Sequence, residues 1–436
     1  MSDFRIYTSI LFSPIEKQFL NDITLSVSPK TGLITKVHKR SAAETSSLDG
    51  ATIASPDIDL RSPGPNGKPR VILPGLVDAH THIFLHAYSD TPSLNQMRDE
   101  SPTERTVRAV NHCRTALLAG YTTYRDLGTE GMLDHDIHIR NAINRGIIPG
   151  PRLFVATECV ASSGGYAVRL ENITNGVPRI ADVGDGVDGV RAAVRRRVGA
   201  GADIVKFYAD YRKRQLRYPP STWPGEPDIQ FPPKSIDRNP NVPLFNQEEM
   251  DAIVREAKLN SIPVAAHAQA AEAVIMAAKA GVTSIEHGFE PSGAALAAMK
   301  EAGCIFVPTL AVLELFLPME AILAHTRKAW DMGIKLACGG DTGAFDHGQN
   351  AREIELFIEA GIPLEEVLTA STLHGWETCG GELCGRKFGC LEEGWAADLV
   401  ALEGDPREDT DSLRRVEFVM KDGRVWKKDG VAVGIA

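Results

Sequence analysis

Eight short apolar runs recur between residues 71 and 340, and stretches with helical periodicity separate them. Strands that alternate with helices form βαβ units and a parallel sheet. Eight such units favour an α/β fold of the (β/α)₈ TIM-barrel type over an open doubly wound sheet. The predicted strands are Val71–Asp78, Tyr121–Asp126, Arg152–Cys159, Asp203–Tyr208, Pro263–His267, Thr283–His287, Ile305–Leu310 and Lys335–Gly340. The predicted helices are Thr103–Ala119, Gly189–Gly199, Gln247–Asn260, Ala270–Ala280, Ala294–Ala302 and Pro318–Met332.

Both ends of the chain instead read as short β runs and turns. Ile23–Val27 and Leu33–Val37 flank a Pro/Gly turn, which predicts a hairpin. Near the other end, the Asp-Gly pair at 422–423 lies between two β-rich runs and is typical of a second hairpin. Residues 39–70 are polar and rich in Ser, Pro and Gly, so we expect exposed loop there.

These two textures predict two domains. We expect residues 1–72 and 389–436 to form a small composite β-sandwich, and residues 73–388 to form the barrel. This division is inferred from the short β runs and turns that both ends of the chain share.

One segment, residues 211–245, breaks the alternation of strands and helices. It contains prolines at 219, 220, 224, 227, 232, 233, 240 and 243, so regular structure is not expected. Because it follows the fourth strand, it would emerge at the carboxyl end of the barrel as a lid, a binding loop or an inert or oligomer-contacting insertion. We expect a homo-oligomer, and sharing of this segment between subunits is a hypothesis.

Composition excludes several classes of protein. A formal net charge of −10 and the lack of a long Lys/Arg cluster argue against a nucleic-acid or anionic-membrane partner. The sequence contains no run of about 18 apolar residues, and Met1–Arg5 lacks the pattern of a signal peptide. The 7 cysteines are scattered without a CxxC pair, which argues against a disulfide framework. We therefore expect a cytoplasmic protein that acts on a small molecule.

The first apolar run leads into His80-Thr81-His82. Side chains at positions i and i+2 of a strand point to the same face, so the two imidazoles can converge on one metal ion. The alternative is a polar turn without a role, because such a pair often arises by chance. The other strand ends decide between the two interpretations.

Four further strands carry polar side chains of the same kind. Lys206 lies within the fourth run, His267 and His287 end the fifth and sixth, and Asp341 follows the eighth. In a (β/α)₈ barrel the carboxyl ends of all strands surround one mouth. Any one of them could be a buried structural group, but a lysine in an apolar strand loses its hydration and its pKa falls unless it is paired. Together they predict one metal site.

These residues resemble the ligand set of the amidohydrolase superfamily in its two-metal form. The sequence is most similar to the imidazolonepropionase-like group, which includes Xaa-Pro dipeptidases and ochratoxinase, a metal-dependent carboxypeptidase. The similar motifs are Lys206-Phe207-Tyr208-Ala209-Asp210-Tyr211, Ala265-Ala266-His267-Ala268, Ile285-Glu286-His287-Gly288, Gly340-Asp341-Thr342-Gly343 and Gly394-Trp395-Ala396-Ala397-Asp398-Leu399-Val400. The Pro-rich segment and the Cys379–Cys390 stretch have no counterpart in that pattern, which leaves the substrate open.

The resemblance implies two divalent ions bridged by a carboxylated Lys206. It implies that His80, His82 and Asp341 hold the more buried ion and that His267 and His287 hold the other. Imidazole and carboxylate ligands favour zinc, with manganese, cobalt or iron as alternatives. A metal-bridged hydroxide would then attack an amide carbonyl, and Asp341 would act as general base and then as acid.

Substrate contacts are predicted at three positions. Tyr208 shares a face with Lys206 and could bind a developing oxyanion or a substrate carboxylate. Tyr166, in a Gly-rich loop after the third strand, and His347, after the eighth, could also reach the substrate. Plain loop or packing roles are the alternative for each. Arg125-Asp126 is interpreted as a buried structural ion pair.

The predicted activity is hydrolysis of an amide or peptide-type C–N bond. An N-acyl amino acid, an Xaa-Pro-like dipeptide or an ochratoxin-like amide is the expected substrate. The alternatives are a cyclic amide, imidazolone or lactone hydrolase with the same metal centre, and a non-catalytic relative that keeps the fold for binding or assembly.

Overall fold

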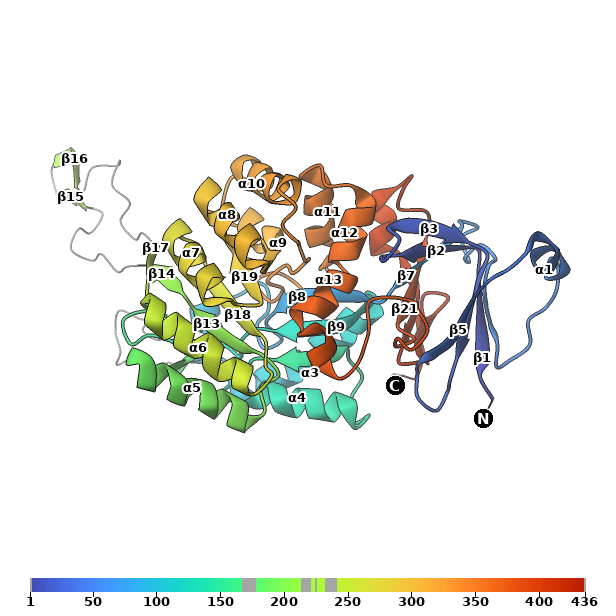
Figure 1. The fold of residues 1–436 in the computed structure, drawn as a ribbon, viewed down its shortest axis with the longest axis horizontal. Coiled ribbons are helices and arrows are strands. Elements are labelled where there is room, and N and C mark those ends of the chain that lie inside the picture. The colour runs from blue at the N-terminus through green and yellow to red at the C-terminus, as the bar shows by residue number, and fades with distance from the viewer. Residues whose placement is uncertain (1, 167–177, 213–220, 224–225, 232–240, 435–436) are drawn as a thin grey trace.

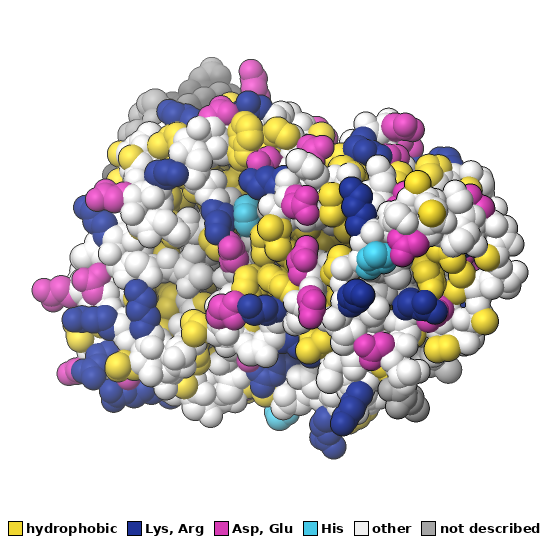
Figure 2. All heavy atoms as spheres, turned by 45° about the vertical axis from the view of Figure 1, so that its right-hand side comes forward, with side chains coloured by type: hydrophobic (Ala, Val, Ile, Leu, Met, Phe, Trp, Pro, Cys, Tyr) yellow, Lys and Arg dark blue, Asp and Glu magenta, His cyan; other side chains and the backbone are white. Residues whose placement is uncertain are grey.

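The computed structural model describes residues 2–166, 178–212, 221–223, 226–231 and 241–434. The helical and parallel-strand part of the chain lies beside a part made of β-strands from both termini (Figure 1). On the face drawn in Figure 2, acidic and basic side chains are interspersed. None of the helices in the described ranges is long and apolar enough to cross a bilayer.

Strands from both ends of the chain form two sheets. The first has the order β5(Ile34–Lys39)-β4(Ile23–Val27)-β1(Phe4–Thr8)-β6(Ile58–Leu60). The second has the order β24(Val431–Ala432)-β23(Arg424–Lys428)-β22(Val416–Lys421)-β21(Leu399–Glu403)-β7(Arg70–Pro74)-β2(Ile10–Ser13)-β3(Gln18–Asn21). Both predicted hairpins are confirmed, as the antiparallel pairs β4–β5 and β22–β23. Side chains of the two sheets share one hydrophobic core, which includes Leu25, Ile72 and Phe418.

The prediction of exposed loop over residues 39–70 was wrong in part. Helix α1 (Ala42–Ser47) begins at a capping box, in which Ser41 and Glu44 bond each other's backbone N–H groups. Strand β6 pairs in parallel with β1. Such local caps and a three-residue edge strand leave little hydrophobic pattern in a polar stretch.

The parallel strands lie in two further sheets. One has the order β10(Arg152–Val155)-β9(Tyr121–Asp126)-β8(Leu76–Thr81). The other has the order β12(Ala181–Val183)-β11(Cys159–Ala161)-β13(Val205–Tyr208)-β18(Val264–Ala268)-β19(Ser284–His287)-β20(Ile305–Val307). The helices include α3(Pro102–Leu118), α4(His135–Asn144), α5(Gly186–Ala200), α6(Gln247–Leu259), α7(Ala271–Ala280), α8(Gly293–Ala302), α10(Glu320–Asp331), α11(Ala351–Glu359), α12(Leu364–Ala370) and α13(Leu373–Thr378). Shorter ones are α2(Ser93–Asp99) and α9(Leu310–Glu314). All six predicted helices are confirmed within a few residues.

Three predicted strands have other bounds. The run Val71–Asp78 is two strands, β7 in the terminal sheet and β8 in the parallel one, which meet at Gly75. A Cβ at Gly75 would collide with the Thr122 side chain, so only glycine fits this crossing. The third run breaks at Thr157 and the seventh ends before Thr309, where φ is 62° and 55° respectively. Such left-handed residues interrupt strand pairing.

The eighth predicted run, Lys335–Gly340, forms no continuous strand but still joins the two parallel sheets. Ala337 N donates to Phe306 O (3.0 Å) on one side, and Ala79 N donates to Cys338 O (2.9 Å) on the other. Asp203 N, which leads into β13, donates to Val155 O of β10 (2.8 Å) at the opposite junction. The carboxyl ends of the parallel strands therefore lie around a common region.

The expectation that residues 211–245 lack regular structure was also wrong in part. β14 (Asp210–Arg212) pairs antiparallel with β17 (Asn241–Pro243), and β15 (Ser221–Trp223) pairs with β16 (Glu226–Phe231). These are two-stranded sheets, in which every strand is an edge and proline is tolerated. The other prolines of this segment, apart from 227 and 243, lie outside the described residues.

Candidate metal centre

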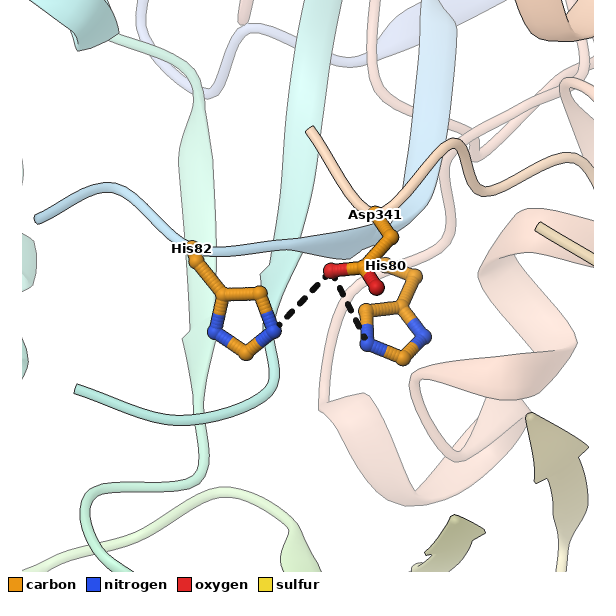
Figure 3. Close-up of side chains that lie close together, drawn as sticks. All are labelled: His80, His82 and Asp341. Carbon is orange, nitrogen blue, oxygen red and sulfur yellow. Dashed lines mark ion pairs between the residues drawn. The ribbon is translucent and has the colours of Figure 1, made fainter. Parts of the chain in front are cut away.

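His80, His82 and Asp341 converge on one point (Figure 3). Nε2 of His82 lies 3.1 Å from Oδ1 of Asp341, and Nε2 of His80 lies 3.7 Å from the same oxygen. One ligand atom from each of the three residues lies within 4.8 Å of the others. In the described part of the chain, this is the one group of His, Cys, Asp or Glu side chains close enough to hold a metal ion.

The backbone around Asp341 is shaped to bring it there. Asp341 has φ of 60°, a left-handed conformation that is costly for a residue with a side chain. Gly339, two residues before Asp341, lies against β8, where an added Cβ would come within 2.7 Å of His80 N. The segment after the eighth run thus folds tightly over the end of β8.

The remaining predicted histidines lie next to this group. The ring of His287 is 5.1 Å from that of His80 and 4.5 Å from that of His267, centroid to centroid. His80 and His82 are 5.4 Å apart by the same measure. The four imidazoles are all buried and form one continuous cluster.

Lys206 lies in the middle of β13, two residues before Tyr208. The side chain is buried, and burial lowers the pKa of its amino group, although the negative charges of Glu286 and Asp341 partly oppose this. A lowered pKa favours the neutral amine. The residue is thus a buried amine close to two carboxylates, as expected from its place in an apolar run.

Three of the histidines have one ring nitrogen hydrogen-bonded away from the cluster. Nδ1 of His80 lies 2.9 Å from Glu286 Oε2, and Nδ1 of His82 lies 2.8 Å from Gly128 O. Nδ1 of His287 lies 2.8 Å from Thr309 Oγ1. Such outer contacts orient a metal-binding imidazole and leave its Nε2 lone pair for the ion.

The carboxylate of Asp78, on β8, connects this strand to the segment that follows the eighth predicted run. It accepts hydrogen bonds from His80 N (3.0 Å), Gly340 N (3.2 Å), Thr342 Oγ1 (2.8 Å) and Asn350 Nδ2 (2.6 Å). Burial raises the pKa of Asp78 to about 6, although these donors favour the charged form.

The surroundings of His267 differ. Its Nε2 lies 3.6 Å from Oδ1 of Asp210, and neither atom has a hydrogen-bond partner among the described residues. The other oxygen of Asp210 accepts from Gln269 N and Ala270 N (2.8 and 2.6 Å). Burial raises the pKa of Asp210 to about 7.

Three tyrosines stand beside His267. Tyr166 stacks on Tyr208 at 3.7 Å with the rings nearly parallel, and Tyr211 packs edge-on against both. Tyr208 is 4.6 Å from the ring of His267, and the hydroxyl of Tyr166 donates to Glu130. Tyr166 and Tyr208, both predicted as substrate contacts, therefore lie together next to the histidine cluster.

His347 contacts the chain on the other side of His82. Its Nε2 lies 3.2 Å from Leu85 O, and its ring stacks on His112 at 4.2 Å. Burial lowers its pKa well below the ordinary value. These contacts with Leu85 and His112 assign no role toward substrate, so that role stays a prediction.

The sequence did not predict which residues hold the histidines in place, and it predicted the wrong partner for Arg125. Arg125 does not pair with Asp126 but donates to Glu286 Oε1 (2.8 Å), while Asp126 accepts from Ile83 N (2.9 Å). Adjacent residues of a strand point to opposite faces, so the proposed pair was geometrically unfavourable. Glu286 itself could have been noticed as a charged side chain inside an apolar strand.

The donor set fits a divalent cation. It offers buried imidazole nitrogens and a partly exposed carboxylate, with the outer nitrogens already bonded. The imidazoles of His80 and His82 hold the pKa of Asp341 well below its ordinary value, against the effect of burial. The Asp341 carboxylate is therefore negatively charged and suited to a cation.

Comparisons with known proteins agree on one family. The model of the amidohydrolase family matches residues 71–426. Ochratoxinase from Aspergillus niger is 28% identical over 424 residues, covering 88% of this chain and 81% of the relative. Among solved structures, an Xaa-Pro dipeptidase with bound methionine has a TM-score of 0.78 and 28% identity, covering 98% of this chain and 100% of its own. The structure of A. niger ochratoxinase has a TM-score of 0.77 and 26% identity, covering 100% and 99%.

Proposed function

Since the chain belongs to the amidohydrolase family and is a hydrolase of carbon–nitrogen bonds, we propose that it cleaves an amide or peptide-type bond in a small molecule. The observation that carries this proposal is the group of His80, His82 and Asp341, in which both histidines are buried. A negatively charged aspartate beside two oriented imidazoles is suited to hold a cation and to move a proton.

We propose that the substrate is an N-acyl amino acid, an Xaa-Pro-like dipeptide or an ochratoxin-like amide. The similarity to an ochratoxinase and to an Xaa-Pro dipeptidase supports these classes. So does the aromatic surface of Tyr166, Tyr208 and Tyr211, which can pack against the flat or ring-shaped part of such a molecule.

The centre is proposed to be binuclear and to take zinc. His80, His82 and Asp341 would hold one ion, His267 and His287 the other, and a carboxylated Lys206 would bridge them. When bound, such ions supply Lewis-acid polarisation of a carbonyl and activation of water. The buried amine of Lys206, whose pKa burial lowers, and the cluster of four imidazoles support this assignment.

The side chains of the protein then have separate tasks. The Asp341 carboxylate takes the proton of the attacking water and delivers it to the leaving nitrogen, as general base and then acid. The Tyr208 hydroxyl donates to the carbonyl oxygen or to a carboxylate of the substrate. Burial of the cluster excludes bulk water and strengthens both interactions.

We also propose that the parallel strands close into one (β/α)₈ barrel and that the terminal sheets form a β-sandwich over residues 1–72 and 389–436, with β7 carrying the first segment to residue 74. The hydrogen bonds at both junctions of the parallel sheets support closure. The hydrophobic core that the terminal sheets share supports the sandwich.

The test is a substrate panel with zinc-loaded protein and an Asp341→Asn control. Dipeptides, N-acyl amino acids and ochratoxin-like amides are compared with cyclic amides, imidazolones and lactones. Faster turnover of the acyclic amides is expected, and exclusive turnover of a cyclic substrate would replace the proposal with that alternative. Less than one equivalent of bound metal and no turnover would instead indicate a non-catalytic relative.

A further inference from the structure

Glu286 lies on β19, one residue before His287, yet its carboxylate contacts another ligand candidate. Oε2 lies 2.9 Å from Nδ1 of His80, which comes from β8. Both side chains are at most 1% exposed. An acceptor this close to Nδ1 determines which ring nitrogen carries the proton.

The other oxygen of Glu286 is bonded just as completely. Oε1 accepts from Arg125 Nη2 (2.8 Å) and from Ser284 Oγ (2.5 Å). Arg125 also donates to Ser284 Oγ (2.8 Å) and to the backbone oxygen of Ala79. The guanidinium is fully buried, so it compensates the charge of Glu286 where water cannot.

We propose that Glu286, held by Arg125 and Ser284, is a positioning residue of the metal centre that keeps the proton of His80 on Nδ1. The Nε2 lone pair then faces Asp341 and is available to a metal ion. This inference rests on the proposed function, because it assigns a task within the same centre.

The contacts explain why a carboxylate rather than a hydroxyl is used. A carboxylate can only accept, so His80 must donate from Nδ1. A hydroxyl could serve as donor or acceptor and would leave both tautomers open. Because Arg125 and Ser284 occupy Oε1, the geometry also prevents Glu286 from turning away from His80.

The decisive variant is Glu286→Gln, which preserves shape and removes one acceptor. Arg125 and Ser284 both donate to Oε1, so the single amide oxygen is expected to face them. The NH₂ group then faces His80 Nδ1, which has to accept. The ring proton moves to Nε2, and the nitrogen beside Asp341 loses its lone pair.

Glu158→Gln is the matched control. Glu158 is also a buried glutamate paired with arginine, here Arg197 and Arg179, and among the described residues it has no hydrogen bond or ion pair with the four histidines. Metal-free wild type and both variants are titrated with Zn²⁺ against a chromophoric chelator. We expect Glu286→Gln to bind Zn²⁺ about 10- to 100-fold more weakly than wild type and Glu158→Gln to match wild type.

The outcomes separate the two proposals. Equal zinc affinity of Glu286→Gln and wild type would overturn the positioning role and leave the proposed function intact. A wild type that binds no Zn²⁺ would overturn both. A loss of affinity of the same size in Glu158→Gln would attribute the effect to general destabilisation and would also overturn the positioning role.

A second measurement does not depend on the folding of Glu286→Gln. Metal-free wild type labelled with ¹⁵N-histidine is studied by NMR, and the His80 signals are identified by their loss in His80→Gln. We expect the proton on Nδ1 and an unprotonated Nε2. A proton on Nε2 in wild type would contradict the proposal.

Discussion

The two sides of the candidate metal centre are held in different ways. Where β8 meets the segment around Asp341, the carboxylate of Asp78 accepts from four donors on both segments. Where β13 meets β18, His267 Nε2 and Asp210 Oδ1 face each other at 3.6 Å, and in the described part of the chain neither has a hydrogen-bond partner. Stacked tyrosines also line this second side.

This difference indicates that the two sides of the metal centre have different tasks. A saturated network of buried hydrogen bonds fixes the positions of its members, because any movement leaves a buried polar group unpaired. On the other side, His267 Nε2 and Asp210 Oδ1 have no hydrogen-bond partner in the described part of the chain, so movement of these two atoms breaks no hydrogen bond there. We therefore interpret the Asp78 side as the rigid support of the metal ligands and the Tyr208 side as the substrate wall.

The largest contrast is expected between Asp341→Asn and Asp210→Asn. The first removes a ligand and proton carrier, so kcat/KM should fall by about 10³-fold or more, together with the bound metal. The second alters a carboxylate that lies 3.6 Å from His267 Nε2 without a hydrogen bond to it, so a much smaller fall than in Asp341→Asn is expected. Steady-state kinetics and metal analysis measure both. Equal losses in the two variants would contradict the proposed division.

Much of the fold could be predicted because its pattern is local. Parallel strands, amphipathic helices and the two terminal hairpins each leave a periodicity within a dozen residues. The division of Val71–Asp78 could not be predicted, since both halves are buried strands and a continuous apolar run does not show which sheet each joins. The paired parts of the Pro-rich segment were missed for the opposite reason, a lack of apolar pattern.

The site shows the same limit. The histidines, Lys206 and Asp341 could be predicted because each stands at or near the end of an apolar run. The partners of these residues could not, because Glu286 reaches His80 and Arg125 from other strands across the interior. Contacts of that kind depend on the directions of side chains in the folded structure, which the spacing of residues along the chain does not give.

A stability comparison tests whether the Asp78 side is the more rigid one. Asn350 is buried and donates to Asp78 Oδ2 and Tyr124 Oη (2.6 and 2.7 Å). Asn350→Ala should lower the free energy of unfolding by about 2–3 kcal/mol, because buried partners lose a donor. Asn241→Ala, which removes a half-buried bond to Gln269 on the other side, should cost less than about 1 kcal/mol. Denaturant titrations that rank the two in the reverse order would contradict the comparison.

Substitution of one tyrosine on each side, Tyr208 and Tyr124, distinguishes a role in catalysis from a role in stability. Tyr208→Phe removes a hydroxyl from the substrate wall, so kcat/KM should fall by about 10- to 100-fold with metal content unchanged. Tyr124→Phe removes an acceptor of Asn350 and should lower stability by about 1 kcal/mol, with kcat/KM close to wild type. Kinetics, metal analysis and thermal melts measure these effects. A Tyr208→Phe variant with wild-type kcat/KM would remove this residue from the substrate contacts.

The smallest predicted effect is the dependence on pH of the rigid side. Glu353 is buried on α11 and accepts from Leu310 N and Ala311 N (3.1 and 2.7 Å). Burial raises the pKa of its carboxyl group from 4.5 to about 8. Between these values the folded state holds a proton that the unfolded state has lost, so the free energy of unfolding falls as the pH rises, by up to about 1.4 kcal/mol per pH unit.

Glu353→Gln should remove this slope, and the difference in unfolding free energy between wild type and Glu353→Gln should shrink by about 1 kcal/mol from pH 5.5 to 6.5. Glu355→Gln on the same helix is the control. Arg414 and Arg352 lower the pKa of Glu355, despite its partial burial, so its contribution is lost only at acidic pH. Its difference from wild type should therefore stay flat over the same interval. A flat difference for Glu353→Gln as well, measured by urea titration, would mean that Glu353 is ionised throughout and that burial on this side is less complete than its contacts indicate.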